Sequence, residues 1–298
     1  MKNKELIFSL LLLIAMAFWG LSWPLSKIMV EYLSPYETAS IRFGLVALSF
    51  IPIMIYLKIP FKIPKKSFKG VFLTSVFNAS YSILFFVGLS LGDAGSAGVI
   101  VTTLAPILAS IVGTFIHHST LLRREKVGLF LGLLSGGFLL GLNHISSLFT
   151  QFNVIFLIAA LLWGSITLSS KSATSYMNAI ALNFYSSVFS FIVFFPSFFI
   201  FGFSEAKNLG NIFWICMLIV GLLSTTFATT IFYKGVHILG INRGGSFTLL
   251  VPVFALLFSW AILGETPSLH TIIGGGIAML GIYFINLFEP NHFKKVKK

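Results

Sequence analysis

Polar side chains are rare in the long apolar stretches of this chain, and they are the residues that could do chemistry. An unpaired polar group in hydrocarbon is costly, so such groups usually face a helix-bundle interior or a water-filled cavity. The candidates for hydrogen bonding to a bound solute, or for stacking on it, are Trp19, Ser22, Trp23, Asn78, Tyr81, Ser82, Thr102, Thr103, Trp163, Thr167, Thr226, Thr230, Tyr233 and Thr248. For any single hydroxyl, the alternative is a bond to a carbonyl of its own helix or of a neighbouring one.

Arg42 is the charged residue with the least access to water, because it lies about seven residues inside an apolar stretch. Glu37 precedes it by five residues, and Glu31 lies in the same polar break. We predict that Arg42 is a structural charge that pairs with a carboxylate. The alternative is that Arg42 attracts an anionic group of a substrate.

Two lysines and two prolines occupy matching places in the two halves of the chain and are candidates for gates and hinges. Lys27 and Lys171 each end an apolar stretch, where gating or substrate contact competes with a role as an interfacial anchor. Pro106 and Pro252 each remove a backbone donor within an apolar stretch. A kink there is expected to act as a hinge, or else to be a static bend.

Residue patterns for catalysis are absent from the sequence. There is no glycine-rich phosphate loop, no His/Cys spacing for a metal, no nucleophile beside a base and no paired acid within an apolar stretch. The single cysteine, Cys216, excludes an internal disulfide. We therefore expect no enzymatic activity, no cofactor, no metal and no direct use of ATP.

The elements that must position these residues are transmembrane helices. Hydrophobic residues make up 57% of the 298 residues, charged residues only 9%, and the mean hydropathy is +0.97. About 20 apolar residues cross the hydrocarbon core of a bilayer. The apolar stretches predict an all-α integral membrane protein with ten transmembrane helices at 6–26, 36–57, 69–91, 94–116, 126–144, 152–170, 179–201, 211–234, 241–263 and 269–288.

Positive charge predicts the orientation of these helices. If the N-terminus is cytoplasmic, the basic clusters from Lys58 to Lys69, from Arg123 to Lys126 and in the tail 289–298 all fall on the cytoplasmic side. We therefore expect both termini in the cytoplasm and a multi-pass protein of the inner (plasma) membrane. The net charge of +12 belongs to these short segments, so nucleic acid is not an expected partner.

The sequence contains an internal repeat. Trp19-Gly20 followed by Lys27 recurs 144 residues later as Trp163-Gly164 followed by Lys171. A second match relates the stretch 88–108 to 235–254, and the halves then run on to Glu125 and Glu265. We predict a first five-helix repeat at 1–145, a second at 152–288 and a basic cytoplasmic tail at 289–298. Because five is an odd number of crossings, the two repeats have opposite orientations, as in many transporters.

These motifs resemble the EamA-like family of the drug/metabolite transporter superfamily. The resemblance rests on the run from Phe18 to Pro24, the pair Arg42-Phe43, the stretch from Gly88 to Pro106, and the stretch from Pro252 to Thr266 followed by Gly274-Gly275-Gly276. It implies a bacterial plasma-membrane carrier that exports or exchanges amino acids or similar metabolites. The adjacent His117 and His118 and the phenylalanine-rich seventh helix depart from that pattern, so the substrate class transfers poorly.

The sequence thus favours secondary transport of a small metabolite, an amino acid or a related compound, by alternating access. The alternatives are a membrane-embedded enzyme or lipid-handling protein, which would need converging acid and base groups, and a channel. Expected partners are the small-molecule substrate and the lipid bilayer. Small-residue ridges at Gly128, Gly132 and Gly136 and on the tenth helix hold helices together and leave a homodimer possible.

Overall fold

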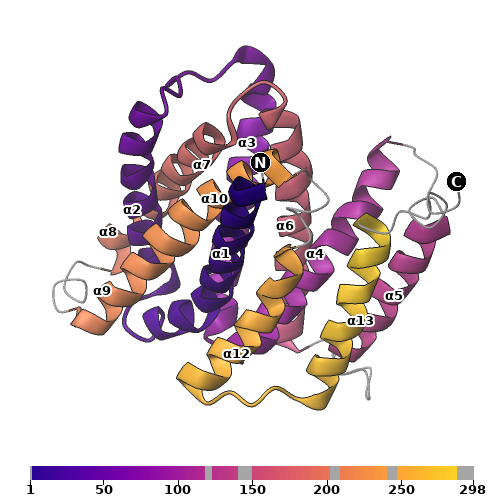
Figure 1. The fold of residues 1–298 in the computed structure, drawn as a ribbon. Helices are drawn as coiled ribbons and strands as arrows, with labels where there is room; N and C mark the ends of the chain where they lie inside the picture. The colour runs from indigo at the N-terminus through magenta and orange to yellow at the C-terminus, as the bar shows by residue number, and fades with distance from the viewer. Residues whose placement is uncertain (1, 118–122, 140–149, 202–208, 240–246, 287–298) are drawn as a thin grey trace, which may run out of the picture.

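The chain is helical throughout the part that the structure describes (Figure 1). The structure, a computed structural model, describes residues 2–117, 123–139, 150–201, 209–239 and 247–286, so the predicted tail 289–298 lies outside the described residues. The elements are α1 (Lys2–Met29), α2 (Pro35–Tyr56), η1 (Lys65–Ser67), α3 (Phe68–Leu89), α4 (Ala94–His117), α5 (Arg123–Leu139), α6 (Gln151–Thr174), α7 (Ala179–Phe194), α8 (Ser197–Phe201), α9 (Asn211–Leu218), η4 (Ile219–Phe227), α10 (Ala228–Leu239), η5 (Phe247–Leu250), α12 (Val251–Leu263) and α13 (Leu269–Asn286).

The described helices match the ten predicted spans. Six stretches are long and apolar enough to cross a membrane on their own: Leu6–Met29, Pro35–Tyr56, Lys65–Leu89, Gln151–Thr174, Ala179–Ile200 and Asn211–Phe232. Shorter apolar helices cover Ala94–Ala109, Lys126–Leu139, Phe247–Leu263 and Leu269–Phe284. The prediction of an all-helical membrane protein with ten helices is therefore confirmed.

The predicted seventh span, 179–201, is not one continuous helix. A turn at Phe195 and Pro196 separates α7 from α8. Proline has no N–H to donate, and its ring clashes with the preceding helical turn, so an unbroken helix is disfavoured there. The apolar pattern alone concealed this break.

The ninth span, predicted at 241–263, also begins differently. Residues 240–246 lie outside the described part, Phe247–Leu250 form a 3-10 turn, and α12 starts at Val251. Pro252 therefore lies in the first turn of α12, where a missing N–H costs no intrahelical hydrogen bond. Pro106 does lie inside α4. The expectation that Pro252 also kinks a helix interior was wrong.

Matching helices of the two halves exchange partners across the bundle. The first helix of the first half, α1, packs against α10 and α12 of the second half, and α6 packs in the same way against α3 and α4 of the first. The helices α2 and α7 contact each other, as do α5 and α13. This is the contact pattern of a pseudo-two-fold axis that relates the halves.

The contacts at the helix ends show that the two halves are inverted. The last turn of α1 meets the turn before α4, since Lys27 Nζ donates to the carbonyl of Gly92. The first turn of α6 lies at the same end, because a Cβ on Gly92 would lie 2.5 Å from the Phe152 ring. At the opposite end, Ser67 Oγ donates to the carbonyl of Ala173 near the end of α6. The matching helices α1 and α6 therefore run in opposite directions.

We call the end of the bundle where α1 ends and α4 and α6 begin the Lys27 end. The opposite end, where α6 ends and α3 begins, is the Lys171 end.

The repeated Trp-Gly pair has the same structural role in both halves. A Cβ on Gly20 would lie 2.8 Å from the Ala255 nitrogen of α12, and a Cβ on Gly164 would lie 3.1 Å from the Ala105 oxygen of α4. A Cβ at Gly20 would force the backbones apart and one at Gly164 would require a small shift, so glycine favours these close approaches between the first helix of one half and the fourth helix of the other. The repeat signal in the sequence therefore marks the contact between the halves.

The small-residue ridges on α5 and α13 face each other within the chain. A Cβ on Gly281 would lie 2.9 Å from the carbonyl oxygen of Gly128 and 3.3 Å from the nitrogen of Gly132. Close packing of this kind replaces the hydrophobic driving force that helices lack in lipid. These glycines thus pair two helices of one chain.

Candidate functional site

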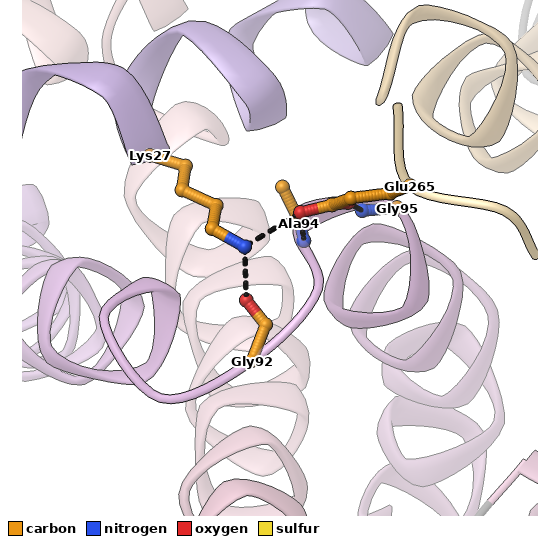
Figure 2. Close-up of polar contacts among 5 residues, drawn as sticks. All are labelled: Lys27, Gly92, Ala94, Gly95 and Glu265. Carbon is orange, nitrogen blue, oxygen red and sulfur yellow. Dashed lines mark hydrogen bonds and ion pairs between the residues drawn. The ribbon is translucent and has the colours of Figure 1, made fainter. Parts of the chain in front are cut away.

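An ion pair joins the two halves at the Lys27 end (Figure 2). Lys27, in the last turn of α1, places Nζ 2.6 Å from Oε1 of Glu265, which follows α12, and 2.8 Å from the carbonyl oxygen of Gly92. The two side chains are 25% and 10% exposed, so water screens the pair only in part. One lysine thus ties α1 to both the turn before α4 and the segment after α12.

The carboxylate of Glu265 also caps α4. It accepts hydrogen bonds from the backbone nitrogens of Ala94 and Gly95, each at 3.0 Å. The first four N–H groups of a helix have no partner within the helix, and the helix dipole favours negative charge there. Glu265 therefore balances the Lys27 charge and stabilises the start of α4 at the same time.

Gly264 directs Glu265 toward this position. It ends α12 with φ of +70°, and its N–H and that of Glu265 close the last helical turn by bonding Trp260 and Ser259 carbonyls. A left-handed residue at this place is usually glycine, because other side chains collide with the backbone there. Gly264 thus ends α12, and the adjacent Glu265 caps α4.

Arg42 lies among aromatic rings in the first half of α2. Its guanidinium carbon is 5.7 Å from the ring centroid of Phe43, 5.8 Å from that of Phe85 and 5.7 Å from that of Phe86. Nη2 donates to Oγ1 of Thr225 at 3.1 Å, and Nε is buried without a hydrogen-bond partner. Among the described residues, Arg42 has no ion pair with the carboxylate that the sequence led us to expect.

Thr225 belongs to a π-helical segment, Ile219–Phe227, within the eighth span. Its hydroxyl donates to the carbonyl of Val220 at 2.9 Å and accepts from Arg42. Such segments have i→i+5 hydrogen bonds, which change the direction of side chains relative to an α-helix and often occur at functional sites. Here the segment aims a hydroxyl at the arginine.

Two further polar bridges link equivalent helices of the two halves. Asn78 Nδ2 of α3 donates to Ser190 Oγ of α7 at 3.2 Å, and Ser49 Oγ of α2 lies 2.6 Å from Thr226 Oγ1 of η4. The pairs α3–α7 and α2–η4 exchange under the pseudo-two-fold axis. A polar layer therefore crosses the bundle beside Arg42.

The tryptophans of the repeat also flank this layer. Trp163 lies 4.9 Å from the Tyr81 ring, centroid to centroid, and Trp19 lies 5.2 Å from Phe232 while its Nε1 donates to the Ser224 carbonyl. Trp163 is 40% exposed. Each tryptophan therefore packs against the third span of the opposite half.

Trp23 lies one turn closer to the Lys27 end than Trp19 and is buried. It packs against the rings of Phe85 and Phe156, with centroids 4.9 Å and 6.3 Å apart, and against Gly98 of α4, whose Cβ would lie 3.2 Å from the indole. Trp23 therefore closes the bundle between the polar layer and the ion pair.

Most of the predicted hydroxyls bond to their own helix. Each donates to a carbonyl three to five residues earlier, as seen for Ser22, Ser82, Thr102, Thr103, Thr167, Thr226 and Thr230. Thr103 and Ser82 are buried, and Thr167 is exposed. A hydroxyl oxygen that donates in this way keeps a lone pair for a second partner.

The remaining candidates are spread along the bundle. Thr248 lies in the 3-10 turn before α12, and the side chain of Tyr233 lies outside the described part of the structure. Lys171 is exposed in the last turn of α6, and its side chain has no ion pair with any described residue.

A cavity of about 260 Å³ opens at the Lys27 end rather than in the polar layer. It lies between the start of α4, the start of α6 and the start of α13, and its lining includes Asp93, Asn153 and His270. Gly92, whose carbonyl binds Lys27, is also at its wall. None of the predicted solute-contacting residues is among those that line it.

Sequence reasoning missed three partners in this region. Glu265 was noted only as part of the repeat, and Ser49 and Ser190 were not predicted. Ser49 follows Arg42 by seven residues, which is the spacing of one helical face, so periodicity was a usable signal. No local pattern pairs Lys27 with a residue 238 positions away.

Comparison with known proteins identifies the family. The model of the EamA-like transporter family matches the chain twice, at residues 6–141 and 152–287. An uncharacterized transporter of Archaeoglobus fulgidus is 28% identical over 281 residues, which cover 93% of this chain and 97% of the relative. The uncharacterized transporter YoaV of Bacillus subtilis is 25% identical, with 91% and 93% covered.

A solved crystal structure shares the fold. It covers 94% of this chain and 97% of its own, with a TM-score of 0.63 and 18% identity. The relatives are transporters, so the expectation that this protein is not an enzyme is confirmed. With two EamA matches that together span nearly the whole chain, this multi-pass membrane protein belongs to the EamA-like transporter family of the drug/metabolite transporter superfamily.

Proposed function

We propose that this protein carries an amino acid or a related small metabolite across the plasma membrane by alternating access, as a secondary transporter. The observation that carries the proposal is the ion pair between Lys27 and Glu265, which joins the halves at one end of the bundle only. The equivalent lysine, Lys171, is exposed at the other end and pairs with no described residue. This asymmetry supports the proposal that the described state is closed at the Lys27 end.

The inverted repeat supplies the second state. Two halves related by an axis in the membrane plane can exchange their conformations, which closes one end as the other opens. By the sequence repeat, Lys171 corresponds to Lys27 and Glu125 corresponds to Glu265. We propose that Lys27 and Lys171 are gating residues, each bound to the glutamate of the opposite half in one of the two states.

The polar layer is the proposed substrate site. It lies between the two ends, it is formed by both halves, and it contains Asn78, Tyr81, Trp163 and Thr226. Hydrogen-bonding groups beside aromatic walls suit a small solute with polar and apolar parts. Pro106 lies inside α4 and Pro252 lies in the first turn of α12, and each of these helices contacts the other half. These two prolines are therefore the proposed hinges.

The distribution of positive charge supports the direction of the bundle. The Lys27 end carries few basic residues, whereas the basic segment from Lys58 to Lys69 lies at the Lys171 end, before α3. Basic loops stay in the cytoplasm. We therefore propose that the Lys27 end faces outward and that the Lys171 end faces the cytoplasm.

Counterflow in proteoliposomes tests the proposed function. Vesicles that contain the purified protein are loaded with one unlabelled solute from a panel of amino acids and nucleosides, and uptake of the same labelled solute is measured. Saturable, transient accumulation of an amino acid without ATP is the expected result. No counterflow of any panel member would refute metabolite exchange, and single-channel currents that do not saturate would favour a channel.

A further inference from the structure

We infer that Arg42 binds the carboxylate of the transported solute and that the solute carries an apolar or aromatic body. This inference rests on the proposed function and specifies its substrate class. It is carried by three observations: the unused donors of the guanidinium, the absence of an acidic partner among the described residues, and the aromatic surroundings.

The guanidinium has donors to spare. It has five N–H groups, and Thr225 Oγ1 accepts from Nη2 at 3.1 Å. Nε is buried without a partner, and no described residue accepts a hydrogen bond from Nη1. Because the Thr225 hydroxyl donates to Val220, its oxygen is oriented to accept from Arg42 and it holds the guanidinium in one position. A fixed fork with free donors matches the two oxygens of a carboxylate.

The nearest acid in the sequence is engaged elsewhere. Glu37 lies in the first turn of α2, where its Oε2 accepts from Ser34 Oγ at 2.7 Å, while its Oε1 is buried without a hydrogen-bond partner and makes no ion pair with Arg42. The one ion pair among the described residues is that of Lys27 with Glu265. A cation inside a membrane-spanning helix is expensive unless an anion or a dipole compensates it. None of the described residues gives Arg42 a counter-charge, and a bound carboxylate would provide one.

The surroundings of Arg42 define the rest of the ligand. Phe43, Phe85 and Phe86 stabilise the cation through their ring faces, at about 6 Å, but they accept no directional hydrogen bond. Phe85 also contacts the Tyr81 ring, with centroids 5.9 Å apart, and Tyr81 in turn contacts Trp163. Arg42 thus stands at one end of a row of aromatic rings. A carboxylate on the arginine places the body of the solute along this row.

Matched ligand pairs test the inference. Thermal unfolding of the purified protein is measured with phenylalanine and phenylalaninamide, with leucine and leucinamide, and with chloride and inorganic phosphate. We expect a carboxylate to raise the unfolding temperature, and its amide to bind about 10- to 100-fold more weakly, the range for loss of a charge-assisted hydrogen bond. Equal stabilisation by acid and amide, or stabilisation by the inorganic anions alone, would overturn the inference.

Variants of Arg42 separate a role in binding the carboxylate from a role in folding. Arg42→Gln should abolish the preference for the acid over the amide while the ligand-free protein still unfolds cooperatively, and Arg42→Lys should keep part of the preference. Glu37→Gln is the matched control and should retain the full preference. If Arg42→Gln does not fold, Arg42→Lys decides: an undiminished preference for the acid in that variant would contradict a bidentate site.

The same ligands in the counterflow assay distinguish failure of the proposed role of Arg42 from failure of the proposed transport function. Saturable counterflow of the acid and its amide at equal rates would overturn the role of Arg42 and leave the transport function standing. Absence of counterflow for every solute, with stabilisation by carboxylates that Arg42→Gln abolishes, would leave the binding site standing and refute transport.

Discussion

The ammonium of Lys27 and the carboxylate of Glu265 lie 2.6 Å apart although the two residues belong to opposite halves of the chain. The same carboxylate accepts from the first two N–H groups of α4, and the same ammonium donates to the turn before it. Charge-assisted bonds of this kind are stronger than neutral ones. One pair of side chains therefore joins α1, α4 and the segment after α12 at the Lys27 end.

Loss of this pair should open the Lys27 end. Lys27→Met is expected to weaken the closed state by about 1–2 kcal/mol, between the values for exposed and buried pairs, which is about a tenfold change in population. A cysteine in place of Ser26, which is buried beside Lys27, should then react about tenfold faster with an impermeant thiol reagent. The native Cys216 is replaced by alanine for this measurement.

A double-mutant cycle checks that the effect comes from the pair. Glu265→Gln alone should raise the labelling rate, and adding Lys27→Met should raise it little further, because both changes remove the same interaction. Lys27→Arg, which keeps the charge, should label like the parent. Strictly additive effects of the two single changes would show that the pair does not hold this end closed.

Gly264→Ala should destabilise the protein by about 1–2 kcal/mol, because an alanine must adopt the left-handed conformation that Gly264 has, with φ of +70°. The measurement is the free energy of unfolding in mixed micelles. Gly276→Ala is the control: a Cβ there meets nothing within 4 Å, and the stability should be unchanged or slightly raised, since alanine favours helix. Equal effects at both positions would contradict the assignment of strain to Gly264.

Gly98→Ala should separate α4 from α12 in the half of the bundle near the Lys27 end. Its Cβ would lie 2.7 Å from the Cβ of Ala255, which is too close for two methyl groups. Overpacking of this kind costs about 1–3 kcal/mol. Gly136→Ala, with a nearest contact of 3.8 Å, should be tolerated. The measurement is the unfolding temperature of each variant, compared with that of the parent in the same detergent. An unaltered value for Gly98→Ala would refute the close packing.

The hydroxyl bridge between Ser49 and Thr226 should contribute little to stability. Hydrogen bonds between membrane helices average about 0.6 kcal/mol in double-mutant cycles. We expect a coupling of this size between Ser49→Ala and Thr226→Val, measured by unfolding in mixed micelles. A coupling above about 2 kcal/mol would instead indicate that the bridge is a main tie between α2 and η4.

Sequence alone determined the membrane character, the ten helices and the inverted repeat. These follow from local properties, because each crossing needs its own run of apolar residues and each Trp-Gly pair lies on one helix. Pro196 was also a usable signal for the break between α7 and α8, since proline disfavours a helix interior. Proline alone does not prove a break, because Pro106 lies inside α4. The start of α12 at Val251 could not be predicted from the sequence, because apolar content does not distinguish the 3-10 turn Phe247–Leu250 from an α-helix.

Only the tertiary structure decided which polar groups meet. Arg42 has Glu37 nearby in sequence, yet its described partner is Thr225, 183 residues away, and Lys27 pairs with Glu265, 238 residues away. Periodicity places a side chain on a helix face, but the neighbour of that face depends on how the two halves pack. The packing in turn depends on close approaches at Gly20 and Gly164, which bring distant helices together without a local signal of what lies opposite.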